Sequence, residues 1–585
     1  MNKSTQILME EAALDYIMRR RSADGLWHGQ LSSSAISTAV ALFALHLSDA
    51  ASHEANVSKA VDWLLLTMQE NGTWGDSPES PSNMTATLLS FAALSSVGQA
   101  PEATKSYLSG CFGGFSDTHI VKGVIRYYGK DLTFSGPILA MCALSGVLSD
   151  WNKIPRFPFE FALLPQSVYR FLRLPVVSYA IPAFIAVGLM VHNRVPTSWF
   201  YTYRTNMIPQ ALRLLRKLQP VHGGYLEAAP LTGFVALCLC GAGYGQHEVA
   251  LASIQFLRNT QRQDGSWPID TNLSTWVTTL VAKVVGSSLS DAPDLIQKLK
   301  SFAEKQAHPF TGVQAGGWGW TSLPGSVPDA DDTSGALLAL FELTKGDFSE
   351  EVEHGLKWLL SMQNNDGGMP TFCKGWGKLP FDRSTPDITA HAFLAMHKWL
   401  PFMPETLSEK CSKSMNRMLT WMRKAQLSDG SWLPLWFGDQ DATNSLSPVY
   451  GTATTVEYLS HSNQELARDL ISRGLNFLLK NQNADGGWGG MKMANSKVSL
   501  TARALTAIAT SCVHSQNSSD VHRVSLMQGL AFLEQRFDQG QLFDPEPIGL
   551  YFSKLWYSED LYQPVFVLQA LRAVDAYQKN RDRKS

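Results

Sequence analysis

The sequence predicts an all-α fold, and two observations carry this prediction. The pattern Gln-x-x-Asp-Gly-x-Trp occurs in full at Gln261–Trp267, Gln426–Trp432 and Gln482–Trp488. Each copy follows a segment whose apolar residues are spaced by three and four, as on one face of an α-helix. Where copies follow one another closely, partial ones included, they lie roughly 40 to 65 residues apart, in or just beyond the range of repeated supersecondary units. The pattern therefore indicates a series of helical repeats.

The predicted helices precede the repeats and cover residues 57–68, 249–257, 352–362, 413–423 and 470–479. Partial copies of the pattern fill the gaps at 21–27, 69–74, 219–225 and 363–369. Each Asp-Gly marks a turn after a helix. The Gln side chain can bond a helix end while the Trp packs on the neighbouring turn. We therefore assign the repeat Trp residues to structure and not to catalysis.

Composition narrows the class of protein. A chain of 585 residues exceeds what one core usually supports, so two domains are expected. With 49 basic and 51 acidic residues the net charge is −2, which argues against a nucleic-acid partner. The seven cysteines are irregularly spaced, and we expect reduced thiols and no zinc site. Residues 1–21 are amphipathic and polar, unlike a signal peptide, so we expect a cytoplasmic protein.

One stretch bears on membranes. Residues 174–191 carry no charge over nearly the length of a membrane span, but Pro175 and Pro182 interrupt them. A buried helix pair is the favoured interpretation. Aromatic and arginine side chains around it suit a surface that dips into one leaflet of a membrane. They are Phe157, Phe159, Phe161, Trp199, Phe200, Tyr201, Arg156, Arg170, Arg173 and Arg204.

Three carboxylates, Asp329, Asp331 and Asp332, stand directly before the apolar run 335–340. Carboxylates packed this closely repel one another and are costly to bury, so at least one should hold a proton at neutral pH. A protonated carboxylic acid in a dry pocket can protonate an alkene. A helix N-cap would explain the cluster without chemistry. A magnesium site on a diphosphate is the third interpretation, but the Asp-Asp-x-x-Asp spacing is absent.

The acidic cluster and the repeats together resemble the squalene-hopene cyclases, a family of class II terpene cyclases. The resemblance rests on Asp329-Ala330-Asp331-Asp332-Thr333 and on the Gln/Trp repeats, and it covers nearly the whole chain. It implies a dumbbell of two α/α barrels (α6-α6 toroids) with a hydrophobic cavity between them. The second barrel, residues 31–262, would be inserted in the first, residues 1–30 and 263–585. A monotopic position on the inner membrane is implied, and a homodimer is allowed.

The resemblance also implies site residues. Asp331 would be the catalytic acid, with Asp329 and Asp332 tuning it. Tyr450 matches a catalytic Tyr of the family, and Asp387–His391 matches another shared stretch. Further positions would contact substrate: Trp320 as an aromatic wall, Asp270, Tyr179, Arg503, Tyr551, Phe552, Trp556 and Tyr557.

Departures from the family pattern concern both the acid and the product pocket. Asn481 stands where we place the family histidine that bonds the acid, before Gln482-Asn483. An Asn can orient a carboxylic acid but cannot become a cation, so Asp331 should be a weaker acid unless Arg503 compensates. Arg503 stands where the family has a cavity Trp, and residues 32–38 lack the expected glutamates. A changed termination pocket implies a changed substrate or product.

The predicted function is proton-initiated cyclisation of a linear polyprene. The substrate would be a prenylated aromatic, a meroterpenoid precursor, or squalene. Aromatic faces would stabilise the cations without attacking them, and no metal or organic cofactor is implied because the acid is the protein's own. Two alternatives are a catalytically silent lipid-binding barrel and a protein prenyltransferase subunit. The latter needs an Asp-x-Cys zinc set, which the sequence lacks.

Overall fold

The computed structural model describes residues 3–129, 132–165, 168, 171, 180–195, 201–308, 313–372, 374, 380–515, 519–550 and 554–583. Within these residues the only strands form two short antiparallel pairs. β1 (Met369–Pro370) pairs with β2 (Ser384–Thr385), and β3 (Ile548–Leu550) pairs with β4 (Leu555–Tyr557). All other long elements are helices, so the predicted all-α class is confirmed.

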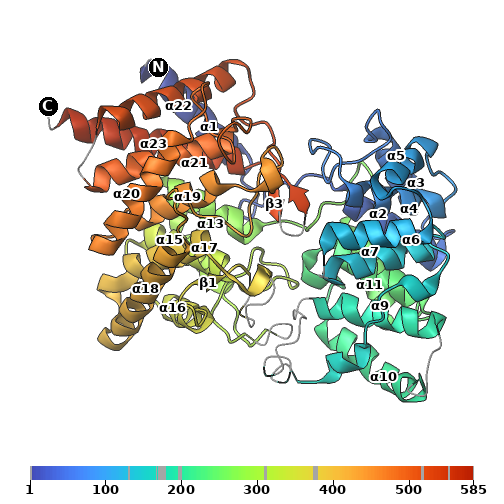
Figure 1. The fold of residues 1–585 in the computed structure, drawn as a ribbon. Helices are drawn as coiled ribbons and strands as arrows, with labels where there is room; N and C mark the ends of the chain where they lie inside the picture. The colour runs from blue at the N-terminus through green and yellow to red at the C-terminus, as the bar shows by residue number, and fades with distance from the viewer. Residues whose placement is uncertain are drawn as a thin grey trace.

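Alternate helices of the C-terminal half of the chain form a closed inner ring (Figure 1). Each inner helix contacts the next, and the last contacts the first. The inner helices are α13 (Ser274–Val285), α15 (Ala330–Thr344), α17 (Pro386–Trp399), α19 (Pro448–Leu459), α21 (Val498–Ser515) and α23 (Tyr562–Asp582). The outer helices are α14 (Ala292–Ser301), α16 (Glu350–Met362), α18 (Glu405–Ala425), α20 (Glu465–Lys480), α22 (Asp520–Asp538) and, from the N-terminus, α1 (Lys3–Arg19).

The second lobe repeats this design with fewer helices. Its described inner helices are α2 (Ala35–Asp49), α4 (Met84–Ser96), α7 (Leu132–Leu144), α9 (Ile181–Arg194) and α11 (Ala229–Gly241). These five already close the ring, one fewer than the six we predicted, because α11 packs directly on α2. A Cβ atom at Gly233 would lie 2.7 Å from Val40 Cγ1, so glycine permits this close approach. The outer helices are α3 (Glu54–Leu66), α5 (Glu102–Phe112), α6 (Asp117–Tyr128), α10 (Tyr201–Leu218) and α12 (Glu248–Thr260).

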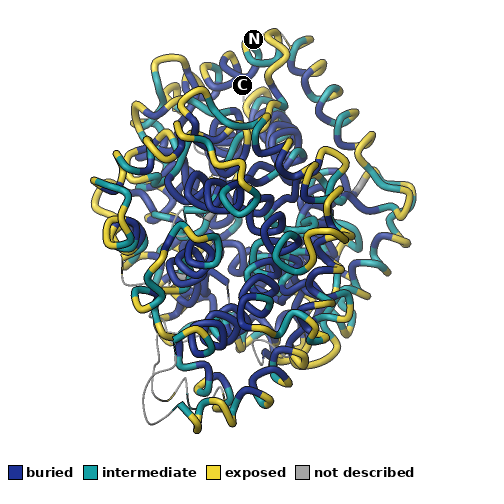
Figure 2. Tube along the Cα trace, turned by 90° about the vertical axis from the view of Figure 1, so that its right-hand side faces the viewer, coloured by how far each residue is buried: buried dark blue, intermediate teal, exposed yellow. Residues whose placement is uncertain are grey.

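Buried apolar side chains form two separate cores. One core joins residues 9–31 to residues 277–577, and the other contains residues 35–267 together with Val327, Phe372 and Phe381. The inner helices are buried along most of their length, while the outer helices expose one face (Figure 2). The division of the cores supports domain boundaries near residues 30 and 262, which stay predictions.

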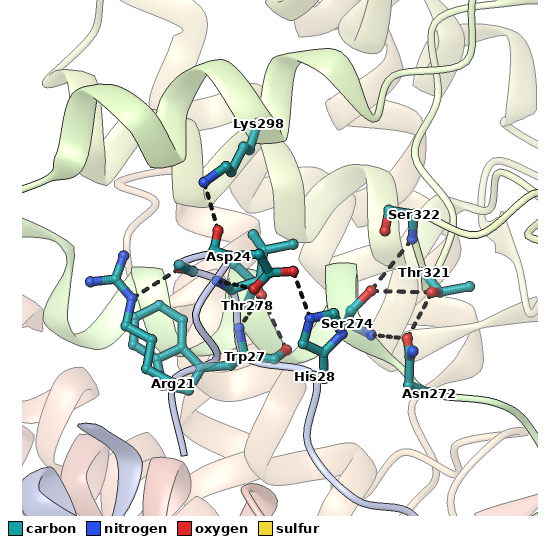
Figure 3. Close-up of polar contacts among 12 residues, drawn as sticks. Arg21, Asp24, Trp27, His28, Asn272, Ser274, Thr278, Lys298, Thr321 and Ser322 are labelled. Carbon is teal, nitrogen blue, oxygen red and sulfur yellow. Dashed lines mark hydrogen bonds and ion pairs between the residues drawn. The ribbon is translucent and has the colours of Figure 1, made fainter. Parts of the chain in front are cut away.

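The segment after α1 is anchored on the first barrel by backbone hydrogen bonds (Figure 3). The Trp27 backbone N–H donates to Thr278 Oγ1 on α13 at 3.0 Å, and the Trp27 indole donates to the Ile17 carbonyl at 2.8 Å. The Lys298 ammonium donates to the Asp24 carbonyl at 2.6 Å. The N-terminus therefore completes the barrel formed by the C-terminal half.

The Gln and Trp side chains of the repeats join successive helix pairs. Gln482 Nε2 donates to the Gly486 carbonyl at 2.7 Å and to the Ser525 carbonyl of the next outer helix at 2.9 Å. Trp488 Nε1 donates to the Leu478 carbonyl of the preceding helix at 2.9 Å. Gln219, Gln261, Gln363, Gln426, Trp27, Trp74, Trp267 and Trp432 make the equivalent bonds. The Trp bonds satisfy carbonyls in the last turn of the preceding helix, and the Gln bonds link each turn to a neighbouring outer helix, which supports a structural role for the repeats.

The helices expected before the repeats are confirmed as α3, α12, α16, α18 and α20. Among the described residues no helix is long and apolar enough to cross a membrane. Of the apolar run 174–191, only the part that begins α9 is described.

Two residues expected on a membrane-facing surface are buried. Phe157 and Phe159 pack where glycines leave room: a Cβ atom at Gly136 would lie 2.4 Å from Phe157 Cζ, and one at Gly188 would lie 2.9 Å from Phe159 Cβ. Arg204 is also engaged, because its Nε lies 3.0 Å from Glu160 Oε2. Phe161 remains half exposed. Trp199, Phe200, Arg170 and Arg173 lie outside the described residues.

Candidate active site

An apolar cavity of about 320 Å³ is lined by residues of both barrels. The first barrel supplies three aspartates of the acidic cluster and most of the aromatic rings. The second barrel supplies mainly aliphatic side chains from α2, α4, α7 and α11. An interior of this kind suits a large apolar ligand.

Asp329 is the N-cap of α15, as the structural interpretation of the cluster proposed. Its Oδ1 atom accepts the backbone N–H groups of Asp331 at 2.9 Å and Asp332 at 2.8 Å. The cap directs the other two carboxyls of the first turn toward the interior. Asp331 keeps 25% of its side chain exposed, whereas Asp329 and Asp332 are 7% and 4% exposed. Asp331 is therefore the carboxyl most accessible to a ligand.

Burial raises the pKa of both other carboxyls, Asp329 and Asp332. Burial raises the pKa of Asp329 to about 7. Burial and the negative charge of Asp329 raise the pKa of Asp332 well above its usual range. A hydrogen bond between these two carboxyls lowers the pKa of Asp329 and raises that of Asp332. Asp332 is thus a proton donor to Asp329 at neutral pH, which supports the expectation that the cluster holds at least one proton.

The hydrogen-bond partner of Asp331 is His391, on the neighbouring inner helix α17. His391 Nδ1 lies 2.6 Å from Asp331 Oδ1, and the histidine is only 1% exposed. The ring stacks on Tyr458 with centroids 4.8 Å apart and meets Trp276 edge to face at 6.1 Å. These contacts fix the imidazole beside the acid.

The predicted contact between Asn481 and Asp331 is wrong. Asn481 ends the outer helix α20, and its Nδ2 atom donates to the Phe477 carbonyl at 2.8 Å. It does not line the cavity. The adjacent Gln482-Asn483 pair belongs to a turn at the end of an outer helix, whereas the acid lies at the start of an inner helix. The histidine that bonds Asp331 is His391, the last residue of the family-like stretch Asp387–His391.

A lysine lies behind the histidine. Lys283 Nζ is 3.3 Å from His391 Nε2 and 5.7 Å from the centre of the Trp276 ring. Burial, and secondly the charge of Lys283, lower the pKa of His391 to about 4. The imidazole is therefore neutral at pH 7. Sequence reasoning missed Lys283 and Trp276, because neither belongs to a recognisable motif.

Aromatic rings form much of the cavity wall. Trp320 and Phe372 have centroids 5.9 Å apart, and Phe372 stacks on Trp436 at 5.9 Å. The rings that line the cavity also include Trp276, Phe437, Tyr557 and Tyr562. Trp320 and Tyr557, which the sequence predicts as substrate contacts, both line the cavity.

The Trp320 loop is tied to the start of α13. The Trp320 carbonyl accepts the backbone N–H groups of Thr275 at 3.0 Å and Trp276 at 3.1 Å. The Thr321 hydroxyl donates to Asn272 Oδ1 at 2.7 Å, and Asn272 Oδ1 also accepts the Ser274 N–H (Figure 3). This network holds Trp320 and Trp276 together on the cavity wall.

Asp270 also lines the cavity, as predicted. Burial, followed by the negative charge of Glu227, raises its pKa well above the usual range. Glu227 itself is fully buried and accepts the Gly325 N–H at 2.7 Å. Asp270 is therefore a further protonated carboxyl near the acidic cluster.

Three predicted site residues lie behind the cavity wall. Tyr450 packs edge to face on Phe437, with centroids 4.9 Å apart. Arg503 forms a buried ion pair with Glu457 at 3.0 Å, so its predicted contact with substrate is wrong. Trp556 is buried, and its backbone N–H donates to Asp76 Oδ2 in the other barrel at 2.9 Å. Tyr179, Tyr551 and Phe552 lie outside the described residues.

Besides the aspartates, a second set of polar side chains lines the cavity. Lys554, Thr85, Tyr128 and Thr133 line it, and all except Lys554 come from the second barrel. Lys554 Nζ lies 4.1 Å from the centre of the Tyr127 ring, and the Thr85 and Tyr128 hydroxyls are 2.8 Å apart. The described residues place no carboxylate within ion-pair distance of Lys554. Nor do they form a cluster of three or more His, Cys, Asp or Glu that could hold a metal ion.

Two toroidal helical barrels, with a carboxylic acid facing an aromatic-lined cavity between them, define a class II terpene cyclase. The squalene-hopene cyclase C-terminal domain matches residues 299–577, and the squalene-hopene cyclase N-terminal domain matches residues 11–106. Together these matches cover well over half of the chain, which belongs to the squalene-hopene cyclase family.

Individual relatives are distant. A probable squalene–hopene cyclase of Sinorhizobium fredii is 21% identical over 92% of this chain and 91% of its own length. Enfumafungin synthase of Hormonema carpetanum is 24% identical over 82% of this chain, which spans 42% of that protein. The solved ent-copalyl diphosphate synthase from Streptomyces platensis covers 98% of this chain and 99% of its own, with a TM-score of 0.54 and 17% identity. The last comparison shows a shared fold.

Proposed function

We propose that this protein cyclises a linear polyprene by protonating its terminal alkene from Asp331. The observation that carries the proposal is the Asp331–His391 hydrogen bond at the wall of an apolar, aromatic-lined cavity. Asp331 Oδ1 is bound by the imidazole, which leaves Oδ2 to carry the proton. Asp329, Asp332 and Asp270 support this state, since each is buried and holds or shares a proton near neutral pH.

The reaction is an isomerisation. The Asp331 proton adds to one alkene carbon, the π electrons form the new C–H bond, and the other carbon becomes a tertiary cation. Neighbouring double bonds then attack in sequence. A final proton loss, or attack by a hydroxyl group of the substrate followed by proton loss, ends the cascade. The released proton balances the one taken from Asp331.

Aromatic faces support the cations. Trp320, Trp276 and Phe372 present π electrons that do not bond to carbon, at about 2 kcal/mol or more for each desolvated contact. The apolar lining from the second barrel keeps water from ending the cascade early. Positioning the alkene against Asp331 should supply much of the remaining rate.

A prenylated aromatic is the substrate class that we favour over squalene. Squalene has no polar atom to meet Lys554, Thr85, Tyr128 and Thr133. An ammonium at an apolar wall that has no carboxylate of the described residues within ion-pair distance is costly, and an anionic group on the ligand would relieve that cost. Lys554 is the only cation among the described lining residues, which matches a carboxylate or phenolate better than a diphosphate.

Product analysis by mass spectrometry tests the proposal. Purified protein is incubated, with no metal added, with squalene and separately with a farnesylated hydroxybenzoate. We expect the arene to give cyclic isomers of equal mass, and Asp331→Asn protein to give none. Conversion of squalene alone would overturn the substrate class. Retention of both lipids unchanged would favour a silent lipid-binding barrel.

We further propose a peripheral position on the membrane. Phe161 and Leu164 are 50% and 39% exposed, and Phe171 is 86% exposed, close in sequence to Arg156. Apolar side chains beside arginine suit insertion into one leaflet. Flotation with anionic vesicles should recover the parent protein and lose the Phe161→Ser, Phe171→Ser variant. Sedimentation of the same samples without lipid would test the predicted homodimer.

A further inference from the structure

Lys283 occupies an unusual position in the first barrel. It projects from α13 beside His391, with its ammonium 3.3 Å from Nε2 and over the Trp276 ring. Trp276 lines the cavity and Lys283 does not, so the lysine lies one layer behind the wall. The positions next to it on α13, Val281, Ala282, Val284 and Val285, are apolar.

The charges around Lys283 come from every helix packed near it. Asp331 and Asp332 face it from α15, His391 from α17, Glu457 from α19 and Arg503 from α21. On the side of α23, Arg572 instead binds the Val284 carbonyl and Glu10.

These charges do not cancel at Lys283. Arg503 and Glu457 are paired at 3.0 Å and neutralise one another. Among the described residues, no carboxylate lies within ion-pair distance of Lys283. Of the carboxyls that act on Lys283, Asp331 is the one that gives its proton to the substrate in the proposed reaction, and the negative charge left there favours the ammonium.

We propose that Lys283 is a positioning residue that holds His391 in its Nδ1–H tautomer and stabilises the Asp331 carboxylate that remains after proton transfer. This inference rests on the proposed function. The ammonium has only donors, so a contact with Nε2 requires that this nitrogen be the acceptor. The single N–H of the neutral ring is then at Nδ1 and donates to Asp331 Oδ1.

The tautomer decides where the acidic proton points. If His391 instead carried its proton on Nε2, the Nδ1 lone pair would face Asp331. The Asp331 proton would then lie in the Asp–His hydrogen bond and away from the alkene. With Nδ1–H as the donor, the proton of Asp331 must be on the other oxygen. The role of Lys283 is thus to keep the proton available to the cavity.

Burial lowers the pKa of Lys283 to about 8. The ammonium should therefore be charged at neutral pH and lose its proton as the pH rises through about 8. Loss of that proton removes the charge that stabilises the Asp331 carboxylate, and the neutral amine can also accept a hydrogen bond from an Nε2–H, so the rate should fall on the alkaline side.

The test compares Lys283→Met with a matched control, Lys398→Met. Lys398 lies on the same helix as His391 and over the Phe341 ring at 5.6 Å, but away from Asp331. We expect kcat of Lys283→Met to fall about 10²-fold with KM within about twofold, and Lys398→Met to match the parent. The alkaline fall near pH 8 should also be absent from Lys283→Met. A parental kcat and pH profile in Lys283→Met would overturn the proposal.

A second readout does not depend on turnover. NMR of isotope-labelled histidine, with the His391 signals assigned by their loss in His391→Gln, should report Nδ1–H in the parent. Lys283→Gln offers a neutral donor, and it should keep this tautomer while lowering kcat through the lost charge. An Nε2–H tautomer in the parent would overturn the inference even in an active enzyme. If no substrate is converted but the tautomer shifts in Lys283→Met, the proposed function fails, and only the part of the proposal in which Lys283 holds the His391 tautomer stands.

Discussion

His391 Nδ1 lies 2.6 Å from Asp331 Oδ1, and the two residues come from adjacent helices of one inner ring. The pair is 60 residues apart in sequence. It combines a carboxyl open to the cavity with an imidazole that is 1% exposed. We expect this pair and its neighbours to carry the proposed chemistry.

Asp331→Asn should lower kcat by about 10³-fold or more, because the amide keeps the shape of the side chain and removes the proton. Circular dichroism and the melting temperature should stay near those of the parent. Asp469→Asn, an exposed change on α20, is the control and should be fully active. Activity of Asp331→Asn within about tenfold of the parent would exclude Asp331 as the acid.

His391→Ala and Asn481→Ala distinguish the observed partner of Asp331 from the one expected from sequence. His391→Ala should lower kcat by about 10²-fold or more, since the acid loses the donor to its Oδ1 atom. Asn481→Ala should keep the activity and lower the free energy of unfolding by about 1 kcal/mol, because only the Phe477 carbonyl loses a hydrogen bond. The reverse pattern in steady-state rates and urea unfolding would contradict the observed pairing.

Trp320→Leu should lower kcat about 30-fold, which corresponds to the roughly 2 kcal/mol of one desolvated cation–π contact. Partly cyclised products should accumulate, since a cation near this wall would be quenched earlier. Trp320→Phe retains an aromatic face and should recover most of the activity. Chromatography of the products with all three proteins provides the measurement, and identical product mixtures would argue for a packing role alone.

Lys554→Met should raise KM for a farnesylated hydroxybenzoate about tenfold with little change in kcat, because the lysine is expected to bind the anionic group and not the reacting alkene. The farnesylated phenol methyl ether, which has no negative charge, should show no difference between the two proteins. An equal loss with both substrates would indicate a structural role for Lys554.

Asp76→Asn should make the stability of the protein less dependent on pH. Burial raises the pKa of Asp76 to about 7 in the folded protein, above its ordinary value of 3.8. The contribution of this group is therefore present below about pH 4 and is lost as the pH rises through about 7. Denaturant titrations from pH 4 to pH 8 should show the parent losing roughly 4 kcal/mol relative to the variant. Parallel curves would mean that Asp76 does not hold its proton in the folded state.

Local patterns in the sequence were sufficient for the all-α class, the positions of the repeat helices and the acidic cluster. Helix periodicity is a property of a few consecutive turns, and the Gln and Trp bonds of each repeat join elements that are neighbours in the chain. The N-cap role of Asp329 is equally local.

The tertiary structure decided which residues surround the acid. Asn481 and His391 both lie near family-like motifs, but only closure of the inner ring shows that α17 faces Asp331 while the end of α20 lies on the outside. Arg503 forms an ion pair with Glu457, and the Lys283 ammonium lies 3.3 Å from His391 Nε2. Both contacts join helices that are far apart in sequence. The sequence alone determined the positions of the helices because their hydrogen bonds join residues that are close in the chain. The residues around Asp331 could be identified only from the tertiary structure, because their charges interact across the barrel.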